Sequence, residues 1–177
     1  VQYYAWAQQW HLRIGIIQTE REDIQMAANA LESERQQLVA RLRNIRETYE
    51  QCVADIPTQV ATSGTEWSVA DLLRHTSGGY LRNLLVRLLD EVDPDLGGGG
   101  FDANANWKRI TDSILLDIDG AIDSAVDLSV EQLGRSGRRG SQTIRVVDLL
   151  AQMADHYDEH LAQLRDEIRP REGLPNL

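Results

Sequence analysis

The sequence predicts an all-α protein: a four-helix bundle preceded by an N-terminal helical extension. Four segments of roughly 23–26 residues each carry apolar residues three and four positions apart, which is helical spacing. Glycine, proline or polar runs separate these segments, and no alternating apolar and polar pattern indicates a strand. We therefore expect an extension over residues 1–30, a bundle over residues 31–170 and a C-terminal tail over residues 171–177.

The extension fits the bundle pattern less well than the rest of the chain. Its aromatic residues crowd one end, and no capping residue marks a helix start. These aromatic residues are Tyr3, Tyr4, Trp6 and Trp10. Four roles stay open: the extension lengthens the first bundle helix, packs on the bundle, joins two copies as a homodimer, or lies upstream of the domain without belonging to it.

The first bundle helix is predicted over residues 31–56. Its apolar positions are Leu31, Leu38, Leu42, Ile45, Tyr49, Cys52 and Ile56. Pro57 and a polar run then end the helix, because proline cannot continue it.

The second helix is predicted over residues 69–92. Ser68 and Asp71 form the capping pair that begins it, and Gly78 and Gly79 interrupt it mildly. The run of four glycines at 97–100 follows as a loop, since ordering four glycines is entropically costly.

The third helix is predicted over residues 102–126. Its apolar positions are Trp107, Ile110, Ile114, Ile118, Ala121, Ile122 and Ala125. Most of its acidic residues are expected on the solvent side: Asp112, Asp117, Asp119 and Asp123.

The fourth helix follows a glycine-rich linker and is predicted to start near Thr143. Its apolar positions are Ile144, Val147, Leu150, Met153, Tyr157, Leu161, Leu164 and Ile168. Pro170 is expected to stop it.

Composition and charge exclude several classes of partner. The 177-residue chain has a formal charge of −10, which repels phosphate backbones, so we expect no nucleic-acid partner. No segment approaches 18 continuous apolar residues and the start lacks a signal-peptide pattern, so we expect no membrane span. The single Cys52 cannot form an internal disulfide, which favours a reducing, cytoplasmic location.

Two histidines on the fourth helix are candidate metal ligands. His156 and His160 lie four residues apart, so both rings lie on one helical face, together with the core positions Met153 and Leu164. Two imidazoles one turn apart can bind one divalent transition metal, and His75, at the margin of the second helix's apolar stripe, is the candidate third ligand. Three histidines leave a coordination position open, which is the catalytic pattern.

Two other interpretations of this segment stay open. The histidines can be core residues without a metal, although burying each ring without a partner costs about 1–3 kcal/mol. The segment also reads H-x-x-E-H, a protease signature in which Glu159 is the general base. The short tail after His160 disfavours the protease reading, because its carboxylates lie too close to come from a separate helix.

Two motifs surround these histidines. The first reads Glu66-Trp67-Ser68-Val69-Ala70-Asp71-Leu72-Leu73-Arg74-His75, and the second reads His156-x-x-x-His160-Leu161 on the last helix. Together they resemble the DinB/YfiT-like family, and the likeness spans residues 31–168. The resemblance implies an up-down-down-up four-helix bundle with a divalent metal, most often Zn or Ni, held by His75, His156 and His160.

The resemblance also implies a class of function. Family members include thiol-dependent transferases that use mycothiol, bacillithiol or glutathione, and mycothiol-dependent isomerases. We therefore expect a metal-dependent thiol S-transferase, or a related hydrolase or isomerase, that takes a low-molecular-weight thiol and a small-molecule substrate. The alternative is a non-catalytic binding or sequestration module, or a dimeric scaffold, on the same bundle.

Further residues are expected around the metal. Asp71 either orients His75 or only caps its helix, and Glu159 is either a solvated carboxylate or one that lies next to the metal ligands. The aromatic residues Trp67, Trp107 and Tyr157 either line the pocket or fill the core. Arg138, with its neighbours Arg135 and Arg139, either meets an anionic substrate or is a solvated loop residue.

Overall fold

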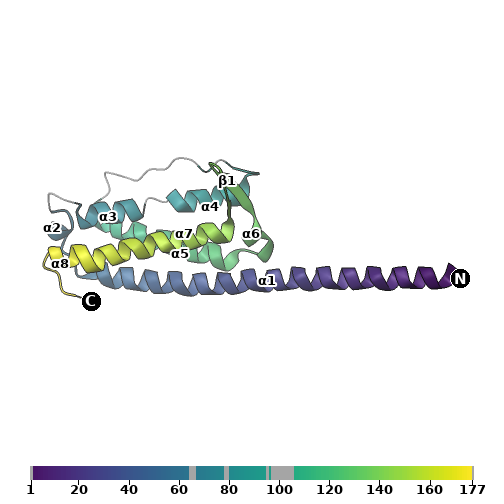
Figure 1. Ribbon diagram of the computed structural model, residues 1–177. Coiled ribbons are helices and arrows are strands. Elements are labelled where there is room, and N and C mark those ends of the chain that lie inside the picture. Colours follow the sequence, from purple (N-terminus) through teal and green to yellow (C-terminus); the bar gives the residue numbers. More distant parts are fainter. Residues whose placement is uncertain (1, 64–66, 78–79, 95, 97–105, 177) are drawn as a thin grey trace.

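The structure is a computed structural model. It describes residues 2–63, 67–77, 80–94, 96 and 106–176, and the side chains of all of these except 2–20 and 80–83. Several predictions lie outside these residues: the aromatic side chains of the extension, Glu66 in the first motif, the break at Gly78 and Gly79, and the glycine loop at 97–100. The described part of the chain is mostly helical, which confirms the all-α class (Figure 1).

The extension lengthens the first bundle helix, which is one of the four roles left open for it. Helix α1 runs without a break over Gln2–Ala54, so residues 2–30 continue the predicted first bundle helix. Residues 21–27 are all exposed; Ile24, for example, keeps 70% of its surface. Pro57 ends this region as expected and precedes the short helix α2 (Thr58–Ala61).

The second predicted helix is two helices. Helix α3 (Val69–Thr76) begins at the predicted cap: the Asp71 N–H donates to Ser68 Oγ at 3.1 Å, and the Ser68 N–H donates to Asp71 Oδ2 at 3.2 Å. Helix α4 (Tyr80–Asp90) follows after a break. A helix of only eight residues is marginal alone, so α3 depends on its neighbours for its position.

The third helix, α5 (Trp107–Asp127), starts later than predicted, at an Asn106 cap. Its buried stripe is the predicted one, but Asp117 is also buried, with 7% of its surface exposed. The expected solvent position of Asp117 is therefore wrong. The reason is a tertiary hydrogen bond, since the Tyr157 hydroxyl donates to Asp117 Oδ2 at 2.8 Å.

The prediction that the chain has no strands is also wrong. After α6 (Val130–Gly134), strands β1 (Ser136–Arg139) and β2 (Gln142–Arg145) form an antiparallel hairpin with Gly140 in the left-handed region at its turn. Each strand buries only one residue, Gly137 and Ile144, so no alternating pattern could show in the sequence. Gly137 is needed because a Cβ there would lie 2.6 Å from Leu88.

The last helix, α7 (Val146–Gln163), therefore starts later than predicted, and Ile144 belongs to β2. It passes into a π-helical segment (Leu164–Ile168) and then into α8 (Arg169–Arg171). Pro170 does not end the helix as predicted, because helical structure continues through Arg171. It lies in the first turn of α8, where the missing N–H costs little.

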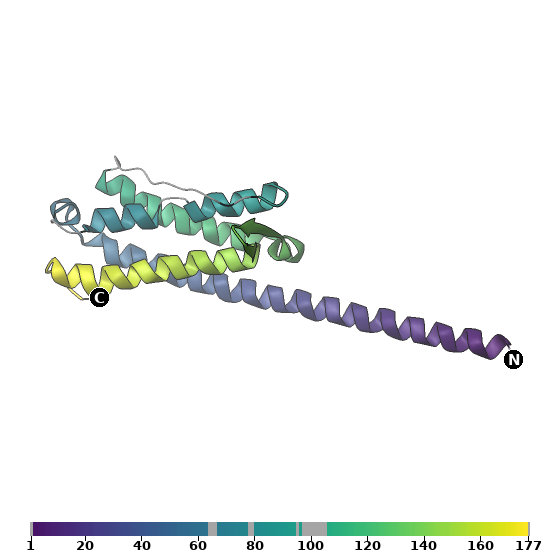
Figure 2. The same cartoon turned by 45° about the horizontal axis from the view of Figure 1, so that its top comes forward.

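The long helices pack side by side around one core (Figures 1 and 2). Helix α1 contacts α5 and α7, and α3 and α4 each contact α5 and α7. The predicted stripe of α1 supplies Leu42, Ile45 and Tyr49 to this core, all fully buried. Helices α3 and α8 lie at one end of the helical body, while α6 and the hairpin lie at the other (Figure 1).

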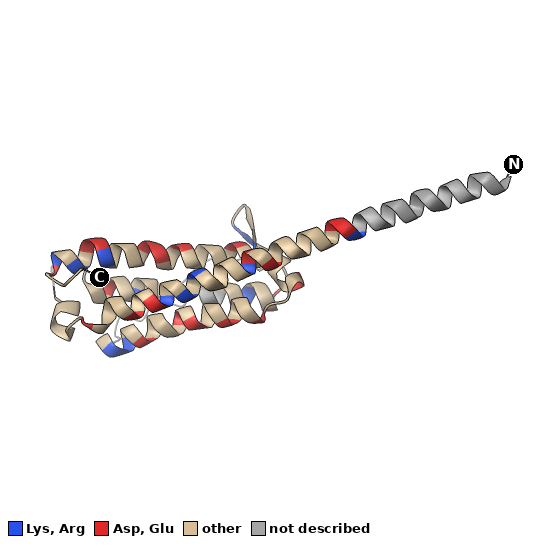
Figure 3. Cartoon of the chain, turned by 90° about the horizontal axis from the view of Figure 1, so that it is seen from below, with Lys and Arg blue, Asp and Glu red and all other residues tan. Residues whose placement is uncertain are grey.

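Ion pairs border the core on the surface. Figure 3 shows basic residues of α1 beside acidic residues of neighbouring helices. Arg41 pairs with Asp155 and Asp158 of α7, and Arg46 pairs with Asp119 of α5. Such exposed pairs each add little stability, but they link α1 to α5 and α7 at the edge of the core. Within the described residues, no helix has the length and apolar content needed to cross a bilayer.

One buried charge fastens the C-terminal end. Arg169 has no exposed surface and donates to both carboxylate oxygens of Asp55, at 2.7 and 2.9 Å. It also donates to the carbonyl oxygens of Cys52 and Pro175. The guanidinium holds the pKa of Asp55 below its ordinary value, so Asp55 stays charged at neutral pH.

Removing this carboxylate should destabilise the fold. We expect Asp55→Asn to lower the free energy of unfolding by about 3 kcal/mol, because it leaves a buried guanidinium without its counter-charge. The control is Arg165→Gln, which breaks the exposed pair with Asp166 and should change stability by less than about 1 kcal/mol. Urea unfolding followed by circular dichroism measures both, and equal small effects would contradict the assigned role of Arg169.

Candidate metal centre

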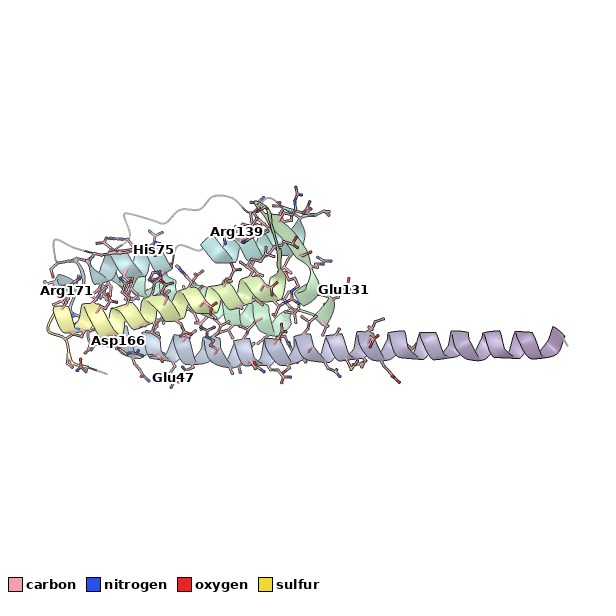
Figure 4. All side chains as sticks on the ribbon, in the orientation of Figure 1. Glu47, His75, Glu131, Arg139, Asp166 and Arg171 are labelled. Carbon is pink, nitrogen blue, oxygen red and sulfur yellow. The ribbon has the colours of Figure 1, made fainter. Side chains whose placement is uncertain are left out.

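Three histidines from two helices meet at one point. His75 comes from the last turn of α3, and His156 and His160 come from adjacent turns of α7. One ligand nitrogen from each lies within 4.8 Å of the others. The ring centroids are separated by 4.6 Å (His156 to His160), 4.9 Å (His75 to His160) and 5.5 Å (His75 to His156). Figure 4 labels His75 on α3, at the end of the helical body that carries α8.

The three histidines differ in how far they are buried. His160 is buried with 7% of its surface exposed, His156 is half-buried, and His75 is exposed. The cluster is therefore anchored in the core through α7 and reaches the surface through α3. This leaves the His75 side open to a small molecule.

The electrostatics favour neutral rings. Burial, and then the neighbouring His160 and His75, lower the pKa of His156 to about 4. Burial and His160 also lower the pKa of His75, while Glu159 opposes the shift in both rings. A neutral imidazole keeps a free lone pair, which is the form that binds a metal.

A hydrogen bond orients the third ring. His160 Nδ1 lies 3.2 Å from Gln163 Oε1. Because a carboxamide oxygen only accepts, this contact favours the tautomer with the proton on Nδ1 and leaves Nε2 free. Histidine ligands in proteins commonly use their second nitrogen in this way.

The donor set fits a divalent transition metal. Three imidazoles suit Zn and Ni, which histidine nitrogens bind at about 2.0–2.1 Å. With three protein ligands, a fourth position is left for a water or a substrate atom. These residues could therefore hold a metal ion with one position open.

Two of the other predicted residues lie near the histidines. The ring of Trp67 stands edge-on to His75, with centroids 5.3 Å apart, and 43% of its surface is exposed. Glu159 is exposed and near enough to raise the pKa of His75 and His156 against the other shifts. The ring of Trp67 and the carboxylate of Glu159 therefore lie on the exposed side of the cluster.

Asp71 and Tyr157 have other partners. The Asp71 carboxylate accepts from Ser68, and Arg74 donates to it at 3.1 Å. These contacts are those of a helix cap. The Tyr157 ring is buried, and its hydroxyl donates to Asp117, so it belongs to the core below the cluster.

Trp107 and Arg138 are placed by other parts of the fold. Trp107 begins α5 and packs, partly buried, against the core. Arg138 lies on β1 and pairs with Asp93, with 3.7 Å between Nε and Oδ2. Because the hairpin and α3 lie at opposite ends of the helical body, Arg138 is not brought to the histidines (Figure 1).

The sequence did not predict the contact of Gln163 with the cluster, or the contacts of Asp117 and Tyr49 in the core beside it. Gln163 follows His160 by three residues, a spacing at which helical side chains meet, so its contact could have been anticipated. Asp117 and Tyr49 each have a hydrogen bond to Tyr157 on another helix, and no local sequence pattern predicts such contacts.

Comparisons with known proteins add no family assignment. No family model matches the chain, and no curated protein matches it either.

The metal-free cluster should make stability depend on pH. Because the pKa of His156 is lowered to about 4 in the folded state from 6.5, the unfolded chain binds more protons between these values. Stability should therefore be complete above pH 6.5, fall as the pH drops towards 4, and show no further loss from this group below it. Urea midpoints of chelator-treated protein at pH 7, 5.5 and 4.5 measure this trend.

The control for this trend is His156→Gln, which keeps a polar side chain but does not titrate. Its midpoint should fall less than that of the wild type between pH 7 and 4.5. Parallel curves for the two proteins would show that His156 has no lowered pKa.

Proposed function

We propose that this chain is a divalent-metal protein that binds Zn or Ni through His75, His156 and His160 and uses the open position to activate a small molecule. The single observation that carries this proposal is the convergence of the three ligand nitrogens within 4.8 Å, from helices far apart in the chain. The lowered pKa values of two of the rings support it, because they keep the donors neutral at pH 7.

We assign the fold, within this proposal, to an up-down-down-up four-helix bundle of the DinB/YfiT-like type. Support comes from the course of the helices: α1 and α7 run in one direction, and α3, α4 and α5 run in the other (Figures 1 and 2). The motif residues Trp67, Ser68 and His75 support it further. Ser68 caps the start of α3, His75 lies in its last turn, and the Trp67 ring lies 5.3 Å from that of His75.

The proposed reaction class is thiol transfer. A divalent metal supplies a Lewis acid that lowers the pKa of a bound thiol or water, so that a nucleophile is available at neutral pH. On this proposal, the histidines hold the metal, Gln163 keeps His160 in the right tautomer, and the exposed ring of Trp67 lies against the small molecule. Glu159 is the exposed carboxylate whose charge acts on His75 and His156.

Metal analysis tests the site. Protein purified without chelator should contain about one Zn or Ni per chain by inductively coupled plasma mass spectrometry, and His75→Ala, His156→Ala and His160→Ala should each lose it. The control is His11→Ala, a histidine of the extension with no other histidine at ligand spacing in the sequence. Saturating metal should also raise the melting temperature of the wild type, since at 100 times Kd binding adds about 2.7 kcal/mol. Full metal content in any of the three cluster variants would remove that residue from the ligand set.

Thiol binding tests the reaction class. Adding mycothiol or bacillithiol to protein loaded with Co²⁺ should change its visible absorption, because a sulfur donor alters the metal's coordination. The same addition to the His156→Ala variant should have no effect. A metal-loaded wild type whose spectrum is unchanged by either thiol would retain the metal site but contradict thiol transfer.

A further inference from the structure

A buried polar network lies beside the histidine cluster. It consists of Tyr49 of α1, Thr76 of α3, Asp117 of α5 and Tyr157 of α7. Each side chain comes from a different helix, and none exposes more than 7% of its surface. The mechanism proposed above uses none of them.

Hydrogen bonds join three of the four residues, and Thr76 lies beside them. The Tyr157 hydroxyl donates to Asp117 Oδ2 at 2.8 Å, and the Tyr49 hydroxyl donates to the Tyr157 carbonyl oxygen at 3.1 Å. The Thr76 hydroxyl lies next to the Tyr49 hydroxyl and donates to the Leu72 carbonyl oxygen at 2.9 Å. Burial raises the pKa of Tyr49, so its hydroxyl stays protonated.

The network is attached to the chain directly next to the metal ligands. Thr76 is the residue after His75, and Tyr157 is the residue after His156. The carbonyl oxygen that Tyr49 reaches therefore lies on the turn of α7 between His156 and His160. Through Tyr49, α1 contacts both helices that supply ligands, at the level of the ligands themselves.

Helix α3 needs such support. It has eight residues, ends at Thr76 and does not continue directly into α4, so its own backbone fixes the position of His75 poorly. A tripod whose ligands come from two helices binds a metal tightly only if the separation of those helices is fixed. Tyr49 lies between the end of α3 and the middle of α7, because its hydroxyl is next to Thr76 and donates to the Tyr157 carbonyl oxygen, and it so helps to set that separation.

The network also costs stability that apolar residues would not. Placing the Asp117 carboxylate in a helical core requires removing it from water, whereas a leucine there would be buried without that penalty. Hydrogen bonds fix distance and orientation, which apolar contacts do not. The buried Asp117 can therefore set the relative position of α5 and α7 in a way that a leucine could not.

We propose that Tyr49, Asp117 and Tyr157 are positioning residues for the metal ligands: they hold α3 and α7 at the separation that lets His75 join His156 and His160. This inference rests on the proposed metal site. It adds to that site a set of core residues that determine metal affinity without touching the metal.

The test compares Zn²⁺ affinity with stability. Zn²⁺ is titrated against a chromophoric chelator in the wild type, Tyr157→Phe and Tyr49→Phe, each shown to be folded by circular dichroism. We expect both variants to bind Zn²⁺ about tenfold more weakly, as for other residues that position metal ligands. The matched control is Ile118→Val, next to Asp117 on α5 and fully buried, which removes core contacts without touching the network and should keep wild-type affinity.

Variants of Asp117 give a second readout. Asp117→Asn keeps a side-chain oxygen that accepts from the Tyr157 hydroxyl, so its Zn²⁺ affinity should stay close to that of the wild type. Asp117→Leu removes the acceptor and should weaken binding as Tyr157→Phe does. If Asp117 only stabilised the fold, the Zn²⁺ affinity of the two variants would follow their free energies of unfolding and not the presence of the hydrogen-bond acceptor.

The outcomes are distinguishable. If the wild type binds no Zn²⁺, the proposed function fails, and this inference fails with it. If the wild type binds one Zn²⁺ per chain but both tyrosine variants bind it as tightly, the proposed function stands and the positioning role is overturned. Equal weakening in Ile118→Val also overturns it, because the effect then follows general stability. If Tyr157→Phe does not fold, Tyr49→Phe decides between these outcomes.

Discussion

The packing of α1 against α5 and α7 is the constraint on which the rest of the structure depends. Its apolar stripe supplies the fully buried Leu42, Ile45 and Tyr49, and ion pairs with Asp119 and Asp158 border the same contact. The shorter elements are placed against this frame. Helix α3 is one of them, and its position decides whether His75 reaches the two histidines of α7.

Three sets of polar groups lie in or next to the core, and each is compensated differently. Asp117, Tyr49 and Tyr157 satisfy one another through hydrogen bonds between helices. Arg169 is satisfied by Asp55 and by the carbonyl oxygens of Cys52 in α1 and Pro175 in the C-terminal tail. Among the histidines, His160 has a hydrogen bond to Gln163, and the three rings face one another, with pKa values lowered in His75 and His156. Neutral rings that face one another around a common point are suited to a shared cation, which is why we propose a metal there.

The hairpin shows how far local sequence signals reach. It turns the chain between α6 and α7, at the end of the helical body away from the histidines (Figure 1). Each of its strands buries a single residue, and Gly137 lies so close to Leu88 and Pro94 that a side chain there would collide with them. The same hairpin carries Arg138 away from the three histidines, although the glycine-rich sequence alone left both places open.

By itself, the sequence determined the helical class, the apolar stripe of α1, the Ser68 cap and the pairing of His156 with His160. Each of these depends on residues within one or two helical turns, where spacing fixes geometry. Only the tertiary structure decided that Asp117 is buried, that Tyr49 reaches α7 and that Arg169 is held by Asp55. These features join residues distant in the chain, and their energies arise from burial and cross-helix hydrogen bonds that exist only once the helices are packed. His75 stands between the two cases: its residue type and motif made it a candidate ligand, and the packing of α3 brought it to the other two histidines.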